Sequence, residues 1–159
     1  MNPLRLYLAP TLLALGLCLA SPDTAAQRIV INELSDIDFG SASSTGGRLR
    51  ADMRFCVALD ERRPYRVLAY GEEVGGAFEL HSGPYRIPYR VRYTDRWRAR
   101  GFRNLTPGQP LMDLRARGNF QGVCNRPNAR IRVILPANAL LQAPAGSYRS
   151  TLTLMVTPE

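Results

Sequence analysis

The sequence predicts an all-β protein built as a sandwich of two packed sheets. Apolar residues alternate with polar or charged ones along much of the chain, which is the side-chain period of a half-buried strand. The alternating segments are short and lie between turns, with 13 Gly and 12 Pro in 159 residues. No long stripe of helical spacing interrupts them. Short strands at this spacing favour a sandwich.

The first 26 residues predict a secretory signal peptide, followed by one domain at residues 27–159. Met1–Arg5 carries one positive charge, Leu6–Ala20 is apolar, and Thr24-Ala25-Ala26 places small residues where a signal peptidase reads. The apolar run is too short for a comfortable membrane span, and no other run approaches one. The remaining 133 residues (159 − 26) suit a single core and imply an exported protein.

The first half of the domain predicts five strands separated by polar or Gly-rich turns. The expected strands are 28–39, 49–57, 65–70, 77–80 and 85–93. The expected loop and turns are 41–47, 60–64 and 71–76. Segment 85–93 alternates most regularly, with Tyr, Ile and Val at its odd positions. Pro88 lies inside it and cannot donate to a ladder, so we expect an edge strand or a bulge there.

The second half is less regular before its last two strands. Segment 97–119 is rich in Arg and Gly, with Leu111 and Leu114 as candidates for a short strand. We expect strands at 129–135 and 148–156, with one helix-like turn at 137–143 between them. Tyr148 heads the last strand and resembles the corner tyrosine of immunoglobulin-like sandwiches. Any turn followed by an aromatic strand start would look the same.

Cysteine usage agrees with export. Cys18 lies in the predicted leader, which leaves Cys56 and Cys124 in the domain. An even number of cysteines in an exported chain favours one disulfide. Closing a loop of about 69 residues would lower the entropy of the unfolded chain and thereby stabilise the folded protein by about 4 kcal/mol at room temperature.

The domain is strongly basic, and all of its cations are arginines. The formal charge of +8 raises the prospect of an anionic partner. Arg86, Arg90 and Arg92 share one expected strand face and are the candidates for contact with an anionic surface. The alternative is that this face is simply solvated while the Tyr face packs into the core. We expect no nucleic-acid partner, because an exported protein rarely meets one.

Several segments together resemble one protein family. They are Asp36-Ile37-Asp38-Phe39-Gly40, Phe55-Cys56-Val57, Ile87-Pro88-Tyr89-Arg90-Val91, Cys124, and the ending from Ala145 to Val156. Their order and spacing are similar to those of the spore coat protein U family, which includes subunits of the archaic chaperone–usher pili. The resemblance covers nearly all of residues 27–159.

The resemblance implies an immunoglobulin-like sandwich that lacks its last strand. A periplasmic pilus chaperone would fill the resulting apolar groove first, and the N-terminal extension of another pilus subunit would replace it as the usher assembles the fibre. The candidate groove residues are Ile29, Ile31, Leu34, Leu152, Leu154 and Val156. The alternative is that these six are core residues of a complete sandwich, or that the fold closes within the chain. The implied destination is the periplasm and then the cell surface, with a role in attachment or biofilm.

One departure from the family concerns the donor segment. Family pilins usually carry such a segment before the strand that ends in the D-F-G-like motif. Here only Gln27 to Ile31 precede the approach to Asp36. If cleavage fell after Ala20 instead, the added residues Ser21–Ala26 would be small and polar, without alternating apolar anchors. We therefore expect a subunit that accepts a strand without donating one, at the end of a fibre or as a minor component.

The sequence predicts no enzyme, no metal site and no cofactor. Asp36 and Asp38 would share a strand face, but no histidine lies near them in sequence. His81 is the single histidine, and a lone histidine is more often filler than a ligand or base. We find neither a nucleophile elbow nor a phosphate-binding Gly-rich loop. The second function class is therefore an exported binding domain that captures an anionic ligand on its Arg-rich face.

Overall fold

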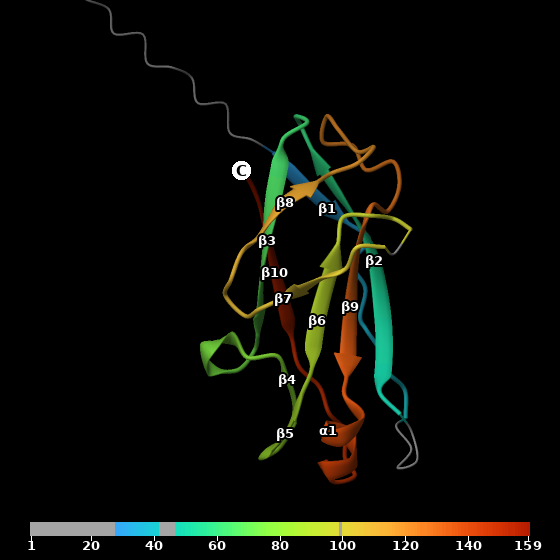
Figure 1. Ribbon diagram of the computed structural model, residues 1–159, viewed down its shortest axis with the longest axis vertical. Coiled ribbons are helices and arrows are strands. Elements are labelled where there is room, and N and C mark those ends of the chain that lie inside the picture. The colour runs from blue at the N-terminus through green and yellow to red at the C-terminus, as the bar shows by residue number, and fades with distance from the viewer. Residues whose placement is uncertain (1–27, 42–46, 99) are drawn as a thin grey trace, which may run out of the picture.

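The computed structural model describes residues 28–41, 47–98 and 100–159 as two antiparallel sheets packed face to face (Figure 1). The predicted signal peptide therefore lies outside the described residues, as does most of the predicted loop at 41–47. Five strands form the larger sheet in the order β1-β2-β9-β6-β7, and three form the smaller sheet in the order β10-β3-β8. A separate hairpin joins β4 to β5. No helix in the described part is long and apolar enough to cross a membrane.

The elements follow the alternating segments of the sequence. The strands are β1 (Ile29–Asn32), β2 (Leu49–Leu59), β3 (Pro64–Gly71), β4 (Glu79–Ser82), β5 (Tyr85–Pro88), β6 (Arg90–Thr94), β7 (Arg103–Leu105), β8 (Leu111–Arg115), β9 (Ala129–Leu135) and β10 (Leu152–Pro158). A short 3-10 turn, η1 (Val74–Gly76), and one helix, α1 (Ala137–Gln142), complete the described chain. The predicted short strand around 111–114 and the helical turn at 137–143 are both confirmed.

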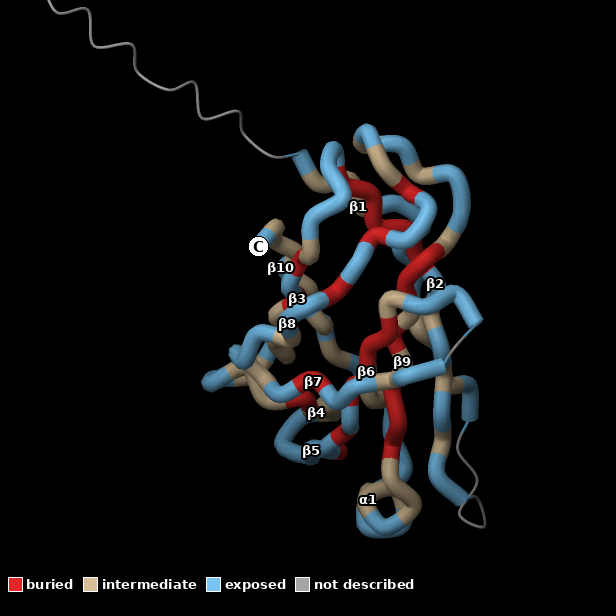
Figure 2. Tube along the Cα trace, turned by 45° about the horizontal axis from the view of Figure 1, so that its top comes forward, coloured by how far each residue is buried: buried red, intermediate tan, exposed pale blue. Residues whose placement is uncertain are grey.

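The core lies between the facing sheets and consists of alternate residues from each strand. On β2, Phe55, Val57 and Leu59 are fully buried. On β3, in the opposite sheet, Tyr65 and Val67 are equally inaccessible. Figure 2 shows buried stretches along β6 and β9 of the larger sheet, and the run 55–59 of β2 is buried without a break. The predicted alternation thus places one side of each central strand in the core.

The strand order is that of an immunoglobulin-like sandwich, as predicted. The sequence β1-β2-β9-β6 matches the A-B-E-D sheet of such a fold, and β10-β3 matches its F-C pair. In a complete sandwich the last strand lies beyond the F strand. Within the described residues, nothing pairs with β10 on that side. Tyr148 donates its hydroxyl to the carbonyl of Pro144 at 3.0 Å, the contact expected of a corner tyrosine.

One predicted strand is in fact two. Segment 85–93 divides at Tyr89, whose amide bonds to the carbonyl of Phe78 at 2.9 Å. The residues before it form β5, paired with β4, and those after it form β6, between β7 and β9. Pro88 ends β5, so the expected irregularity becomes a change of sheet. The short β7 was not predicted.

The ends of the domain also differ from the predicted strands. β1 stops at Asn32, and Asp36–Gly40 is irregular because the Asp38 carboxylate accepts the Gly40 amide at 2.8 Å. Asp36 and Asp38 therefore do not share a strand face as expected. At the other end, β10 begins at Leu152, and Arg149 makes only an isolated bridge to His81.

The predicted disulfide between Cys56 and Cys124 is present and fixes a long loop against β2. Asn128, at the end of this loop, bonds to both the amide and the carbonyl of Val57, at 2.9 and 2.8 Å. Its side chain thereby continues the ladder to β2 just before β9 begins at Ala129. Asn119 donates to the carbonyl of Arg126 at 2.7 Å and holds the loop together internally.

Candidate functional site

The candidate site is the open edge formed by β1 and β10, which lie in different sheets but contact one another. β10 is paired with β3 along its whole length, from Leu152 opposite Gly71 to Pro158 opposite Tyr65. β1 is paired with β2 over Ile29–Asn32. In the described part of the chain, each of the two strands has hydrogen-bonding partners on one side only. Two sheet edges thus lie beside each other without a strand between them.

The side chains along this edge are only partly covered. Leu152, Leu154 and Val156 on β10 pack against the core but are half-buried. Ile29 and Ile31 on β1 have the same status. The equivalent core-facing residues of β3, one strand further in, are fully buried. Apolar side chains that are buried on one flank and open on the other are what a missing strand leaves behind.

Leu34 is placed differently from the other five candidate groove residues. It follows β1 in an irregular segment and is 59% exposed. It is not among the apolar residues packed against the core. The structure therefore brings Ile29, Ile31, Leu152, Leu154 and Val156 to the open edge and leaves Leu34 outside it.

The far end of β10 is held firmly to β3. Arg66 on β3 donates to the Thr157 hydroxyl at 2.8 Å, and the Glu159 amide bonds to the Pro64 carbonyl at 3.1 Å. These contacts fix the C-terminal end of β10 within the smaller sheet.

The three candidate arginines do not form a single cluster. Arg86 is on β5, where its guanidinium lies 3.0 Å from the Glu73 carboxylate. Arg90 and Arg92 are on β6, on the outer face of the larger sheet, and Arg92 donates to the Phe102 carbonyl at 2.8 Å. Arg90 is exposed, whereas Arg92 is half-buried. Any anionic contact by Arg90 and Arg92 would thus be made without Arg86.

The outer face of the larger sheet carries a partly buried ion pair that the sequence analysis did not single out. Arg132 on β9 makes two hydrogen bonds to Asp52 on β2, at 2.6 and 2.7 Å. These bonds lower the pKa of the Asp52 carboxyl. Desolvation by burial opposes this change, and the positive charges of Arg132, Arg130 and Arg50 lower the pKa further. Asp52 is therefore a carboxylate at neutral pH and partly neutralises the arginines around it.

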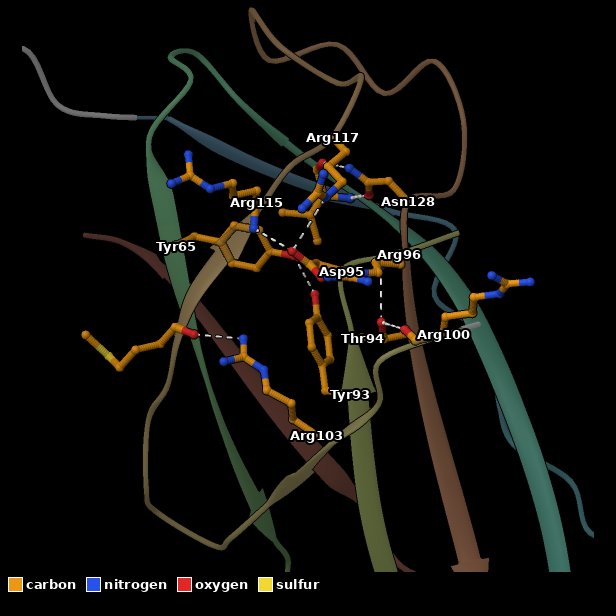
Figure 3. A network of polar contacts seen from close by, with 12 residues as sticks. Tyr65, Tyr93, Thr94, Asp95, Arg96, Arg100, Arg103, Arg115, Arg117 and Asn128 are labelled. Atoms are coloured by element: carbon orange, nitrogen blue, oxygen red, sulfur yellow. Dashed lines mark hydrogen bonds and ion pairs between the residues drawn. The ribbon is translucent and has the colours of Figure 1, made fainter. Parts of the chain in front are cut away.

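A polar network lies at one end of the sandwich (Figure 3). The hydroxyls of Tyr65 and Tyr93 meet at 2.7 Å, and the two residues come from opposite sheets. Burial raises the pKa of both hydroxyls above the ordinary tyrosine value. The adjacent Asp95 carboxylate accepts the Arg115 amide at 3.0 Å and lies 4.0 Å from the Arg117 guanidinium. The network joins the two sheets and is structural in character.

The described residues hold no group of three or more His, Cys, Asp or Glu that could bind a metal ion. His81 faces Glu73 at 3.6 Å and takes part in the bridge to Arg149.

Sequence reasoning missed a small cavity on the outer face of the larger sheet. Arg54, Trp97, Arg126, Pro127, Ala129 and Arg130 line it. Arg96, Trp97 and Arg98 follow the Tyr-Arg segment in the sequence, which is a local signal for a basic aromatic surface. Arg54 and Arg126 carry no such signal, because only the pairing of β2 with β9 and the disulfide loop bring them there.

Comparison with known proteins supports the fold. No protein-family model matches the sequence, and no curated protein sequence matches it either. The structure is similar to a chain from a chaperone–tip adhesin complex of CFA/I fimbriae biogenesis, with a TM-score of 0.58 and 16% sequence identity. The match covers 82% of this chain and 42% of that one, so this chain spans less than half of the length of its structural neighbour. At this identity the likeness is one of fold.

Proposed function

We propose that this protein is an exported fimbrial subunit that is completed by a strand from another pilus protein. A chaperone would supply the strand first, and a second subunit would replace it at the usher. The observation that carries the proposal is the open edge of β10, lined by half-buried Leu152, Leu154 and Val156. Main-chain groups of β10 offer hydrogen bonds to an added strand, and the side chains offer pockets for its alternate residues.

Two further observations support an exported pilus role. The Cys56–Cys124 disulfide suits the periplasm or cell surface, because disulfides form and persist in oxidising compartments. The similar fold in a chaperone–tip adhesin complex, together with the resemblance to spore coat protein U, favours a fimbrial system with a chaperone as partner. An attachment function and a place at the cell surface follow from the same proposal.

The proposal is tested by supplying the strand within the chain. A tight Asn-Gly turn added after Glu159 leads into a strand as long as β10, with apolar residues at the positions that face the core. We expect this extension to raise the free energy of unfolding, because each donor side chain that becomes fully buried contributes about 1.5–3 kcal/mol. Urea denaturation followed by circular dichroism measures the gain. Amide hydrogen exchange along β10 should slow at the same time.

The matched control is the same extension with Ser at the core-facing positions. It has the same length, turn and backbone hydrogen-bonding capacity but no apolar anchors, and we expect it to leave the stability nearly unchanged. Equal stability of the two extended chains would contradict the proposal. So would amides of β10 that are as protected as those of β3 in the protein without an extension, because the edge would then already be covered.

A finer part of the proposal is that the subunit ends a fibre or is a minor component. Its support is that only Gln27 to Ile31 precede the approach to Asp36, and that cleavage after Ala20 instead would add only Ser21–Ala26, which lacks the alternating apolar residues that a donor strand places in pockets. In purified fibres, quantitative mass spectrometry should find far fewer copies of this chain than of the shaft subunit. If antibodies against this chain labelled many copies along the whole shaft, the proposal of a terminal or minor subunit would be wrong. The proposal that the chain accepts a strand would be unaffected.

A further inference from the structure

A second recessed site lies away from the open edge, on the outer face of β2 and β9. Its volume is about 210 Å³, and we call it the Trp97 pocket. Three stretches of the chain build it. Arg54 comes from β2, Trp97 comes from the chain that follows β6, and the third stretch is 126–130, which leads into β9 with Ala129 and Arg130. Arg126 and Pro127 come from the end of the disulfide loop. Its volume suits a group smaller than a drug-sized ligand.

The strand pairing concentrates positive charge beside this pocket. Arg54 on β2 lies directly opposite Arg130 on β9, and Arg92 on β6 lies directly opposite Arg132. Like charges in directly opposed strand positions destabilise a sheet. Asp52 offsets part of the cost, but it is engaged chiefly by Arg132 and lies 3.6 Å from Arg130. In the described chain, Arg54 and Arg126 make no ion pair within 4.0 Å.

Two of the pocket arginines, Arg130 and Arg126, also make contacts with uncharged groups of the chain. Arg130 donates to the Trp97 carbonyl at 3.2 Å, and its side chain is only 12% exposed. Its Nε is buried without a hydrogen-bond partner in the described structure, which is costly unless something accepts from it. Arg126 lies against Gly118, where a Cβ would come within 3.0 Å of the guanidinium. The Arg130 guanidinium is thus positioned before any ligand arrives, which favours binding.

Trp97 adds an apolar surface to this cationic site. Its side chain is 56% exposed, although tryptophan is usually well covered. The Arg98 guanidinium lies 4.9 Å from the centre of the indole ring. A ligand that fits this combination has an anionic group for the arginines and an apolar ring face for the indole. Sugar acids have both.

We propose that the Trp97 pocket binds a carboxylated sugar unit of an acidic polysaccharide. The sugar carboxylate would accept charge-assisted hydrogen bonds from Arg54, Arg126 and Arg130. The ring would lie against Trp97. The pocket offers one aromatic ring and no row of them, whereas single-stranded nucleic acid is held by successive stacking platforms. The disulfide also belongs to compartments where acidic polysaccharides are met more often than nucleic acid.

The test is a fluorescence titration of the purified, disulfide-bonded protein with trigalacturonate. Trp97 is the only tryptophan of the chain, so its emission reports directly on this pocket. We expect a saturable change with trigalacturonate and none with its methyl ester, which lacks the charge. Arg54→Gln and Arg126→Gln should each weaken binding about tenfold or more, the usual effect of losing a hydrogen bond to a charged group.

Arg50→Gln is the matched control. Arg50 is exposed on the same strand and outer face as Arg54, and it does not line the pocket. The two variants lose the same charge, and we expect Arg50→Gln to change the affinity by less than about twofold in physiological salt. Thermal unfolding of each variant verifies that it is folded.

Several results would overturn the proposal. Equal weakening by Arg50→Gln and Arg54→Gln would show that only the general field of the arginine face attracts the ligand. Binding of the methyl ester with the same affinity, or no saturable binding of trigalacturonate, would show that the pocket does not recognise a sugar carboxylate. Tighter binding of a single-stranded oligonucleotide or a sulfated disaccharide, lost in the same pocket variants, would assign the pocket to phosphate or sulfate instead.

Discussion

The hydroxyl pair between the two sheets gives a prediction that can be worked out from the structure. Tyr65 on β3 and Tyr93 on β6 are both fully buried, and their oxygens lie 2.7 Å apart. Tyr93→Phe removes one hydroxyl and leaves the buried Tyr65 hydroxyl without this hydrogen-bond partner. The substitution changes almost no volume, so the cost arises from the hydrogen bond.

The expected magnitude follows from the difference between losing one partner and losing both. A buried polar group left without a partner costs about 1–3 kcal/mol. Tyr93→Phe and Tyr65→Phe should therefore each lower the free energy of unfolding by about that amount. The double variant leaves no hydroxyl unpaired, so its loss should be smaller than the sum of the two single losses.

The same pair predicts sensitivity to alkali. Burial raises the pKa of both hydroxyls in the folded protein, so they stay protonated at a pH where they ionise in the unfolded chain. The unfolded chain then binds fewer protons, and stability falls as the pH rises above about 10. At about pH 11 each hydroxyl lowers the free energy of unfolding by about 1.4 kcal/mol. The double Phe variant should lack this contribution.

Urea denaturation of the four chains at neutral pH and near pH 11, with the disulfide intact, measures both effects. The other tyrosines titrate equally in the wild-type and double-variant chains, so the difference between these two isolates the buried pair. Single variants that unfold within about 0.5 kcal/mol of the wild type would refute the account of the bond. If the free energy of unfolding fell by the same amount near pH 11 in the double variant as in the wild type, ionisation of the buried pair would not be the cause.

Three further predictions concern the larger sheet and its loop. Asp52→Asn should cost about 1–2 kcal/mol at neutral pH, because Arg132 loses a carboxylate partner. Since the pKa of Asp52 is lowered in the folded protein, the difference from the wild type should begin to shrink below about pH 4 and vanish only below the lower folded-state pKa; a constant difference would contradict this. Reduction of the Cys56–Cys124 disulfide should lower the urea-derived free energy of unfolding by about 4 kcal/mol, and an unchanged midpoint would show that the loop adds no constraint. Asn128→Ala should cost about 2–3 kcal/mol and speed exchange of the β2 amide that its side chain pairs; slow exchange there would mean that another group replaces it.

The strands of the core could be predicted because their signal is local. Side chains of a strand alternate between two faces, so Phe55, Val57 and Leu59 identify a core face without knowledge of any partner. The division of segment 85–93 could not be predicted by the same reasoning. Ile87 and Val91 are both buried, so the alternation runs through the break unchanged while the neighbouring strand switches from β4 to β9. Alternation specifies faces and not partners.

The two candidate sites also differ in how far the sequence pattern could predict them. Five of the six candidate groove residues could be assigned to sheet edges because they lie on β1 and β10, whose alternation is visible in the sequence. Leu34 lies beyond the end of β1, since the segment after Asn32 is not extended. The Trp97 pocket depends on residues as far apart as Arg54, Trp97 and Arg126. Their approach is set by strand register and by the disulfide loop, neither of which is written in the local pattern.

The open edge and the Trp97 pocket can be occupied at the same time because they use different surfaces. A strand added beside β10 extends the smaller sheet, whereas the pocket opens on the outer face of β2 and β9 in the larger sheet. None of the residues that line the pocket belongs to β1 or β10. A subunit fixed in a fibre by its edge would therefore keep its ligand surface free, which is the arrangement that attachment requires. The two proposals can also fail separately: we expect a substitution at Arg54 to leave the proposed strand addition unchanged, and an added strand beside β10 to leave binding in the Trp97 pocket unchanged.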